Sequence, residues 1–177
     1  MNKKLKLWEL DRKSPENFRA QQKFPIVVIL DDIRSLNNVG SFFRTADAFN
    51  VTKIILGGIT ACPPHKDIRK TALGATETVD WSHSENLLEE IKVLQNAGYT
   101  VGSIEQTEKT TLLQDVAAFE AKPYALIFGN EVNGVRQELV DASDCVIEIP
   151  QFGTKHSFNV SVCAGIVLWE FCKMFID

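Results

Sequence analysis

Residues 24–58 read FPIVVILDDIRSLNNVGSFFRTADAFNVTKIILGG, and this stretch decides the fold class. It begins with a continuous apolar run, residues 24–32, which is typical of a strand buried on both faces of a parallel sheet. Apolar residues at helical spacing follow in residues 37–50, and a second apolar run in residues 52–58 ends at paired glycines. A strand–helix–strand unit joins parallel neighbours, so the sequence predicts an α/β fold.

The same alternation of strands and helices continues to the end of the chain. We expect a mainly parallel sheet with helices on both faces, because each crossover helix must pack against the sheet. The further strands are predicted at residues 77–81, 99–105, within 122–131 and at 145–150, and the further helices at residues 68–73, 84–98, 112–119 and 157–176.

The length and composition indicate an ordinary globular protein. The length of 177 residues fits about one domain, and the 45% hydrophobic and 24% charged fractions exclude disordered, collagen-like and coiled-coil chains. The four cysteines form no C-x-x-C pair and the three histidines are scattered, so we expect no metal site and no disulfide framework. The first residues lack the apolar segment of a secretory signal, which favours a cytoplasmic location.

Charge is divided unevenly along the chain. Residues 1–23 hold seven Lys or Arg and three acids, whereas the remaining residues carry a net charge of −8. We therefore expect a basic N-terminal extension, residues 1–23, followed by one domain, residues 24–177. A basic extension on an acidic body indicates a polyanion partner, and the alternative is a solvated leader without a specific role.

Residues 157–176 form an apolar helix without a polar face. Such a helix is buried on both sides, and in a domain of this size the second side most simply meets another subunit, so we expect a homodimer. The alternative is a core helix covered within one chain. A membrane span is disfavoured because Asn159, Glu170 and Lys173 lie at scattered depths, and a charge at mid-bilayer costs roughly 2.5–3.5 kcal/mol.

The first cluster of polar residues follows the first strand. Arg44 lies one helical turn after Gly40, which predicts open space beside the guanidinium. Asn38 lies at the mouth of the helix, where its side chain can cap the helix or face a ligand. The alternative is that Asn38 is only a cap and that Arg44 only pairs with Asp47 or Asp32.

The second cluster follows the strand within residues 122–131, at a strand end where parallel sheets bind ligands. Gly129 and Gly134 bracket Asn130 and Glu131, and the two glycines permit a positive φ or a close approach of the backbone to a ligand. The alternative is a tight turn with an exposed Glu131.

The third cluster follows the last strand. The loop contains Pro150 and Gly153, leads to Ser157 and Asn159 at the predicted helix start, and can wrap a small molecule with its backbone N–H and C=O groups. The chain has neither a G-x-G-x-x-G motif after the first strand nor a G-x-x-x-x-G-K-[ST] motif, which disfavours a dinucleotide or ATP site.

Together the three clusters resemble the motifs of the SpoU (TrmH-type) branch of the SPOUT RNA methyltransferases. The family patterns N-x-G-x-x-x-R-T-A, F-G-x-E-x-x-G and I-P-x-x-G-x-x-x-S-x-N-V-S-V match NNVGSFFRTA, FGNEVNG and IPQFGTKHSFNVSV, at residues 37–46, 128–134 and 149–162. Three motifs in order are far more specific than one. Gln151 and Phe158 depart from the Met and Leu that the family usually has at these places.

The resemblance implies an α/β fold with a C-terminal trefoil knot, and a dimer that binds S-adenosylmethionine at its interface. It also implies methyl transfer to a ribose 2′-hydroxyl of tRNA or rRNA, and because no separate RNA-binding domain precedes the catalytic body, tRNA is the expected target. By motif position Arg44 corresponds to the family's catalytic arginine, with Asn38, Glu131, Ser157 and Asn159 as its site partners. The implied cofactor-binding residues, several of them through backbone groups, are Leu126, Phe128, Gly129, Asn130, Gly134, Ile149, Pro150, Gln151, Gly153, Phe158 and Asn159.

Arg44 is better interpreted as a fixed cation than as a base. A guanidinium is not normally deprotonated in proteins, so its charge would stabilise the alkoxide that develops on the ribose. Two alternatives to the methyltransferase remain: a catalytically silent RNA-binding protein of the same fold, and an unrelated α/β oxidoreductase or nucleotide-binding protein.

Overall fold

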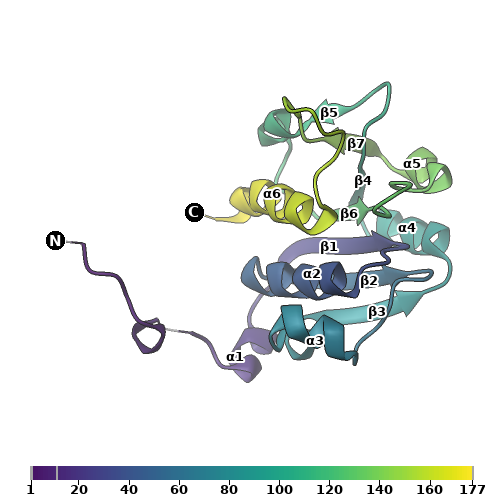
Figure 1. Ribbon diagram of the computed structural model, residues 1–177. Coiled ribbons are helices and arrows are strands. Elements are labelled where there is room, and N and C mark those ends of the chain that lie inside the picture. The colour runs from purple at the N-terminus through teal and green to yellow at the C-terminus, as the bar shows by residue number, and fades with distance from the viewer. Residues whose placement is uncertain (1, 11, 177) are drawn as a thin grey trace.

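The computed structural model describes residues 2–10 and 12–176, which contain a seven-stranded sheet (Figure 1). Each pair of neighbouring strands is parallel, in the order β3-β2-β1-β6-β4-β7-β5, so the predicted α/β class is confirmed. The strands are β1 Phe24–Asp31, β2 Val51–Gly57, β3 Asp80–Ser84, β4 Thr100–Ile104, β5 Thr111–Leu112, β6 Tyr124–Phe128 and β7 Cys145–Glu148. The α-helices are α1 Pro15–Ala20, α2 Leu36–Ala48, α3 Lys66–Ala72, α4 Leu87–Asn96, α5 Gln137–Ala142 and α6 Val160–Cys172, and the 3-10 helices are η1 Leu7–Glu9, η2 Ala75–Glu77, η3 Leu113–Ala118 and η4 Lys173–Phe175.

Helices cover both faces of the sheet, as expected. Ile26, Val28 and Leu30 of β1 join a core with α2, α3 and α6, which lie in front of the sheet in Figure 1. Val27 and Ile29 of the same strand face a second core with α4 and α5. Because both faces are covered, the first strand is apolar from Phe24 to Leu30 and does not alternate with polar residues.

The boundaries of β3 and α4 differ from the prediction. The strand predicted at residues 77–81 begins later, because the 3-10 helix η2 precedes it. Ser84 ends this strand and is not the predicted helix cap. Asn86 caps α4 instead, and its side chain accepts a hydrogen bond from the backbone N–H of Glu89 at 3.2 Å.

The second half of the chain contains elements that local spacing does not predict. The helix predicted at residues 112–119 is the short strand β5 followed by η3, because β5 pairs with the distant strand β7. The helix α5 is absent from the prediction. The last helix begins at Val160, with Asn159 rather than Ser157 next to its first turn. The trefoil knot stays a prediction, because strand order does not establish how the chain is threaded.

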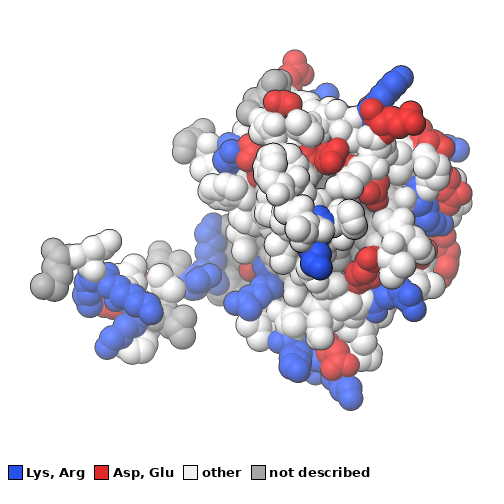
Figure 2. All heavy atoms as spheres, turned by 45° about the horizontal axis from the view of Figure 1, so that its top comes forward, with Lys and Arg blue, Asp and Glu red and all other residues white. Residues whose placement is uncertain are grey.

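Among the described residues, the hydrogen bonds that join the N-terminal extension to the body come from its second part. The guanidinium of Arg19 donates to the carbonyl oxygen of Glu77 at 2.8 Å, and the amide of Gln21 donates to Oδ1 of Asn50 at 2.6 Å. Residues 2–10 project away from the body in Figure 1, and Figure 2 shows Lys and Arg atoms gathered on this projecting segment. The division of the chain after residue 23 stays a prediction.

The helix α6 is apolar on all sides, but the rest of the chain covers only one of them. Five of its side chains are buried, whereas Val162, Ile166 and Trp169 are between 38% and 52% exposed. The alternative of a core helix covered within one chain is therefore wrong. None of the helices in residues 2–10 and 12–176 has both the length and the hydropathy that a membrane crossing requires.

Candidate functional site

A cavity of about 510 Å³ opens at the carboxyl ends of β4, β6 and β7. Its walls are the loop after β4 from Glu105 to Thr107, the loop after β6 from Gly129 to Val135, and the loop after β7 as far as Phe158. The volume lies within the roughly 300–1,000 Å³ of small-molecule sites. The second and third sequence motifs therefore form two walls of one cavity.

Both glycines of the loop after β6 are required by its shape. A Cβ on Gly129 would lie 2.1 Å from the backbone of Gly134, and one on Gly134 would lie 2.1 Å from Oε2 of Glu105. Gly134 also has a φ of +69°, which residues with a side chain rarely adopt. The backbones of Asn130 and Gly134 exchange hydrogen bonds of 3.0 and 2.9 Å, so the loop closes tightly on itself.

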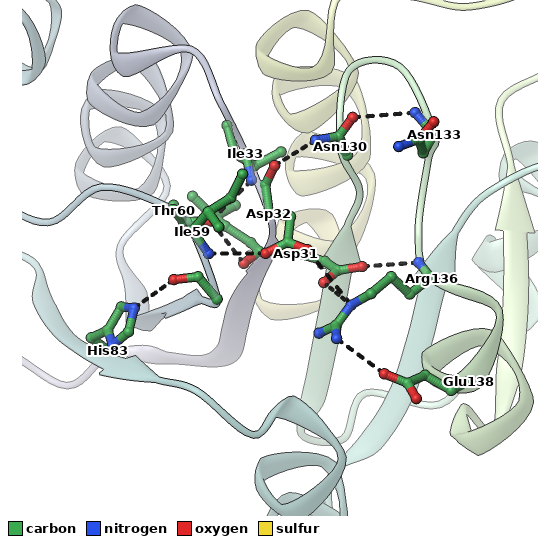
Figure 3. A network of polar contacts seen from close by, with 12 residues as sticks. Asp31, Asp32, Ile33, Ile59, Thr60, His83, Asn130, Asn133, Arg136 and Glu138 are labelled. Carbon is green, nitrogen blue, oxygen red and sulfur yellow. Dashed lines mark hydrogen bonds and ion pairs between the residues drawn. The ribbon is translucent and has the colours of Figure 1, made fainter.

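Asn130 anchors this loop with its side chain. Its Nδ2 donates to the carbonyl oxygen of Asp32 at 2.7 Å, and its Oδ1 accepts from the backbone N–H groups of Val132 and Asn133 at 2.9 and 3.2 Å (Figure 3). The side chain is half-buried between the ends of β1 and β6. Its amide groups therefore hold the loop in place against the first strand.

Three of the predicted site residues form a chain of hydrogen bonds. The carboxylate of Glu131 accepts from the Nδ2 of Asn38 at 2.9 Å, and Oδ1 of Asn38 accepts from the Nδ2 of Asn159 at 3.2 Å. Ser35 caps α2, so Asn38 is not its cap and its buried amide is free to link the other two residues. Ser157 lies on the loop before α6 and lines the cavity.

Glu131 is held in its charged form by the start of α2. Burial favours the neutral acid, but hydrogen bonds from the backbone N–H groups of Arg34 and Ser35, at 3.0 and 3.1 Å, and from Asn38 outweigh it. The pKa of Glu131 is therefore lowered. The carboxylate also faces the N-terminus of a helix, which favours negative charge. Glu131 is nevertheless exposed and lies in a tight turn, so that alternative describes its exposure correctly and misses only the hydrogen bonds of its carboxylate.

Arg44 lies apart from the other four predicted catalytic residues. It is exposed and lines a second hollow of about 410 Å³, together with Arg12, Lys13 and Phe18 of the N-terminal extension. Among the described residues Arg44 makes no ion pair with Asp47 or Asp32, so that alternative is not observed. In a single chain Glu131 and Ser157 line the cavity, and Asn38 and Asn159 are linked to Glu131 by hydrogen bonds, whereas Arg44 lies at the second hollow.

The predicted open space beside Arg44 is absent at Gly40. A Cβ there would lie 2.1 Å from Oγ1 of Thr71 and 2.3 Å from the carbonyl oxygen of Ile68. The glycine instead allows α3 to pack closely against α2. Helical spacing correctly places the glycine and the arginine one turn apart, but it does not show which neighbour fills the space.

The predicted cofactor-binding residues fall into three groups. Leu126 is buried in the middle of β6, where it pairs with β1 and β4. Pro150 and Gly153 lie on the loop after β7, outside the lining of the cavity, and Asn159 lies next to it at the start of α6. Those that line the cavity are Phe128, Gly129, Asn130, Gly134, Ile149, Gln151 and Phe158.

Sequence reasoning missed several lining residues, of which the acids matter most. Glu105 and Glu148 line the cavity with Glu131, and none of the described lining residues is Lys or Arg. Glu105 is the last residue of the strand predicted at residues 99–105, so its place at a strand end was a usable signal. Cys163 also lines the cavity, and burial raises the pKa of its thiol to about 12.

A buried ion pair fastens the end of the loop to the sheet. Asp31 has a fully buried side chain and accepts from Nε of Arg136 at 2.7 Å and from the backbone N–H of Arg136 at 2.9 Å (Figure 3). Burial lowers the pKa of this guanidinium, but the hydrogen bond to Asp31 and the negative charges of Asp31, Asp32 and Glu138 together outweigh burial and raise the pKa. The guanidinium also contacts Glu138 at 3.0 Å. Asp31 thereby holds the start of α5 against β1.

The fold and the cavity define a class of protein. A parallel α/β sheet with two motif-bearing loops around one acidic cavity, to which Asn38 of the first motif is linked by its hydrogen bond to Glu131, is the arrangement expected of a SPOUT-type protein with a small-molecule site. Residues 25–169 match the SpoU rRNA Methylase family, and the chain belongs to that family.

Named relatives and solved structures agree with this assignment. A 23S rRNA (guanosine-2′-O-)-methyltransferase RlmB of Neisseria meningitidis is 34% identical over 150 residues, which is 82% of this chain and 57% of the relative. The protein of the same name from Vibrio parahaemolyticus is 31% identical over 92% of this chain and 64% of its own length. This chain thus spans about 60% of the length of such relatives.

Two solved structures share the fold. An AdoMet-bound rRNA methyltransferase from Sinorhizobium meliloti has a TM-score of 0.79 and 27% identity, covering 94% of this chain and 62% of that one. The TrmH/SpoU tRNA modifying enzyme of A. aeolicus has a TM-score of 0.78 and 26% identity, covering 90% and 79%.

Proposed function

We propose that the protein transfers a methyl group from S-adenosylmethionine to a ribose 2′-hydroxyl of RNA. The observation that carries this proposal is the acidic cavity, one of whose lining residues, Glu131, is hydrogen-bonded to Asn38 and through it to Asn159. The named relatives act on RNA, and one structural neighbour binds AdoMet, which supports the same chemistry here.

The residues of the cavity fit the methyl donor. Three carboxylates suit a ligand that carries a sulfonium and an ammonium group, because opposite charges attract strongly in a partly desolvated cavity. The loop after β6, from Gly129 to Val135, lines the cavity and would form one side of the donor site. When bound, the donor supplies an electrophilic methyl group. The ribose oxygen then forms a bond to that carbon as the carbon–sulfur bond breaks, and the hydroxyl proton leaves to water or to an RNA phosphate.

Positioning is the main task of the protein in such an in-line displacement, and good alignment supplies up to roughly 7–11 kcal/mol. We propose that Asn38, Glu131, Ser157 and Asn159 orient the ribose and that Arg44 stabilises the developing alkoxide as a fixed cation. An Arg44→Lys variant tests this role. A kcat near that of wild type shows that a positive charge suffices. A large decrease in kcat shows that the planar guanidinium with its paired N–H donors, or proton acceptance by it, is needed.

The proposal includes a homodimer. Arg44 lies away from the cavity of its own chain, and Val162, Ile166 and Trp169 leave an apolar face of α6 uncovered. A two-fold partner on this face would bury it and could bring its own arginine to the cavity. An Ile166→Glu variant should sediment as a monomer, bind RNA poorly and lose activity. A monomeric variant with full activity would contradict the dimeric site.

The catalytically silent RNA-binding protein is distinguished by activity. Calorimetric titration with S-adenosylmethionine and with NAD should show binding of the first only, and radiolabelled methyl groups should enter undermodified RNA. The preference for tRNA over rRNA stays a prediction, since relatives are named for both. Ribose-methylation mapping of total RNA from a deletion strain decides it. A cytoplasmic location also belongs to the proposal, and the four free cysteines suit a reducing compartment.

A further inference from the structure

We propose that the loop between β7 and α6 carries a nucleobase-stacking site for single-stranded RNA, formed by Phe152 and Lys155, two exposed residues of this loop. This inference rests on the proposed function, because it assigns the lip of that cavity to the RNA. It names the group of the RNA that the rim of the cavity recognises, which is an unstacked base next to the methylated ribose.

Phe152 is the most exposed large apolar side chain recorded among the described residues, with 96% of its surface accessible. Its neighbour Gly153 has open space around it, since a Cβ there would meet nothing within 4 Å. Gln151, His156 and Phe158 of the same loop line the cavity, whereas Phe152 and Lys155 do not. The loop therefore has an inner part facing the cavity and an outer part facing solvent at its rim.

The charges around the cavity require a cation at the rim. The described lining has three glutamates and no Lys or Arg, so it repels phosphate groups. The loop segment 151–157 has no acid and contains Lys155, which is exposed. An RNA strand that reaches the cavity can place a phosphate at this ammonium while an adjacent base meets the Phe152 ring.

A base suits Phe152 better than an apolar protein surface does. The residues next to it in the loop are Gln151, Gly153, Thr154 and Lys155, which are polar, charged or without a side chain. The broad apolar face for a second copy is that of α6, whose exposed side chains are all aliphatic or aromatic. An isolated ring beside a cation is instead the usual composition of a stacking platform for single strands.

The test uses the full chain and two fluorescent 12-nucleotide single-stranded RNAs, one of mixed sequence and one with the same backbone but abasic at the central positions. Anisotropy titrations should show tighter binding of the RNA that has bases. Phe152→Ala should weaken binding of that RNA by roughly 5- to 150-fold and remove most of the preference, while Phe152→Trp keeps it. Lys155→Gln should weaken both RNAs alike and reduce the slope of log affinity against log salt by about 0.7.

Matched controls are Val93→Ala and Lys92→Gln on α4, which change an exposed apolar side chain and an exposed cation away from the cavity. Neither should change either affinity. The inference is overturned if Phe152→Ala keeps the preference for bases, if wild type shows none, or if Phe152→Ala changes the sedimenting mass, which would assign the ring to a subunit contact. Calorimetry with S-adenosylmethionine distinguishes failure of the proposed function from failure of the stacking site. If wild type does not bind S-adenosylmethionine, the proposed function is rejected. If wild type binds it normally and Phe152→Ala keeps the preference for RNA with bases, only the stacking site is rejected.

Discussion

Removal of the Arg136 side chain should destabilise the protein. In Arg136→Met the buried carboxylate of Asp31 loses its 2.7 Å partner and keeps only the backbone N–H of residue 136. Loss of this charged hydrogen bond leaves the buried carboxylate without its cation and lowers the free energy of unfolding by about 2–3 kcal/mol. The loss is smaller than for a wholly buried pair because the arginine side chain is 39% exposed. For a chain of this length the midpoint of thermal unfolding should fall by about 4–12 °C.

Urea unfolding followed by circular dichroism measures the loss, and a double-mutant cycle with Asp31→Asn isolates the pair. The double variant should be less destabilised than the sum of the single variants, because neither unpaired charge remains. Glu138→Gln is the control: it breaks the outer contact of Arg136, with an acid 53% exposed, and should cost less than about 1 kcal/mol. A loss below about 0.5 kcal/mol in Arg136→Met, or additivity in the cycle, would refute the assigned role.

Three further predictions concern the walls of the cavity and a buried cysteine. Gly134→Ala should lower the free energy of unfolding, measured in urea, by at least about 1–2 kcal/mol for its positive φ and by more for the collision with Glu105. The control is Gly98→Ala, where φ is +87° and a Cβ would have open space, so only the loss due to the positive φ is expected. Because the pKa of Glu131 is lowered in the folded protein, its ionised carboxylate stabilises the fold fully above the unfolded-state pKa of 4.5, and this stabilisation is lost as the pH falls through the folded-state pKa. Glu131→Gln should therefore flatten the acid side of the curve of unfolding free energy against pH. An unchanged curve would contradict this role. Cys172, which is buried and whose pKa burial raises to about 12, should resist a thiol reagent at pH 8 until urea is added, and mass spectrometry that finds it modified in the folded protein would contradict its burial.

The sequence predicts elements best where one local pattern suffices. The apolar run at residues 24–32 and the glycine-terminated run at 52–58 correspond to β1 and β2, because a strand buried on both faces needs apolar residues at every position. The strand β5 escapes prediction, since its two residues are defined only by pairing with β7. The cap of α4 moves from Ser84 to Asn86 because the preceding strand extends further than its apolar residues indicate.

The sequence by itself determined the order of the three motifs and hence the family, since motif identity depends on residue types and spacing alone. Only the tertiary structure decided which of these residues meet: it joined Asn38, Glu131 and Asn159 by hydrogen bonds, brought Glu105 and Glu148 to the same cavity, and left Arg44 at a different hollow. The physical reason is that residues about a hundred positions apart become neighbours through the order of strands in the sheet, which no local pattern encodes.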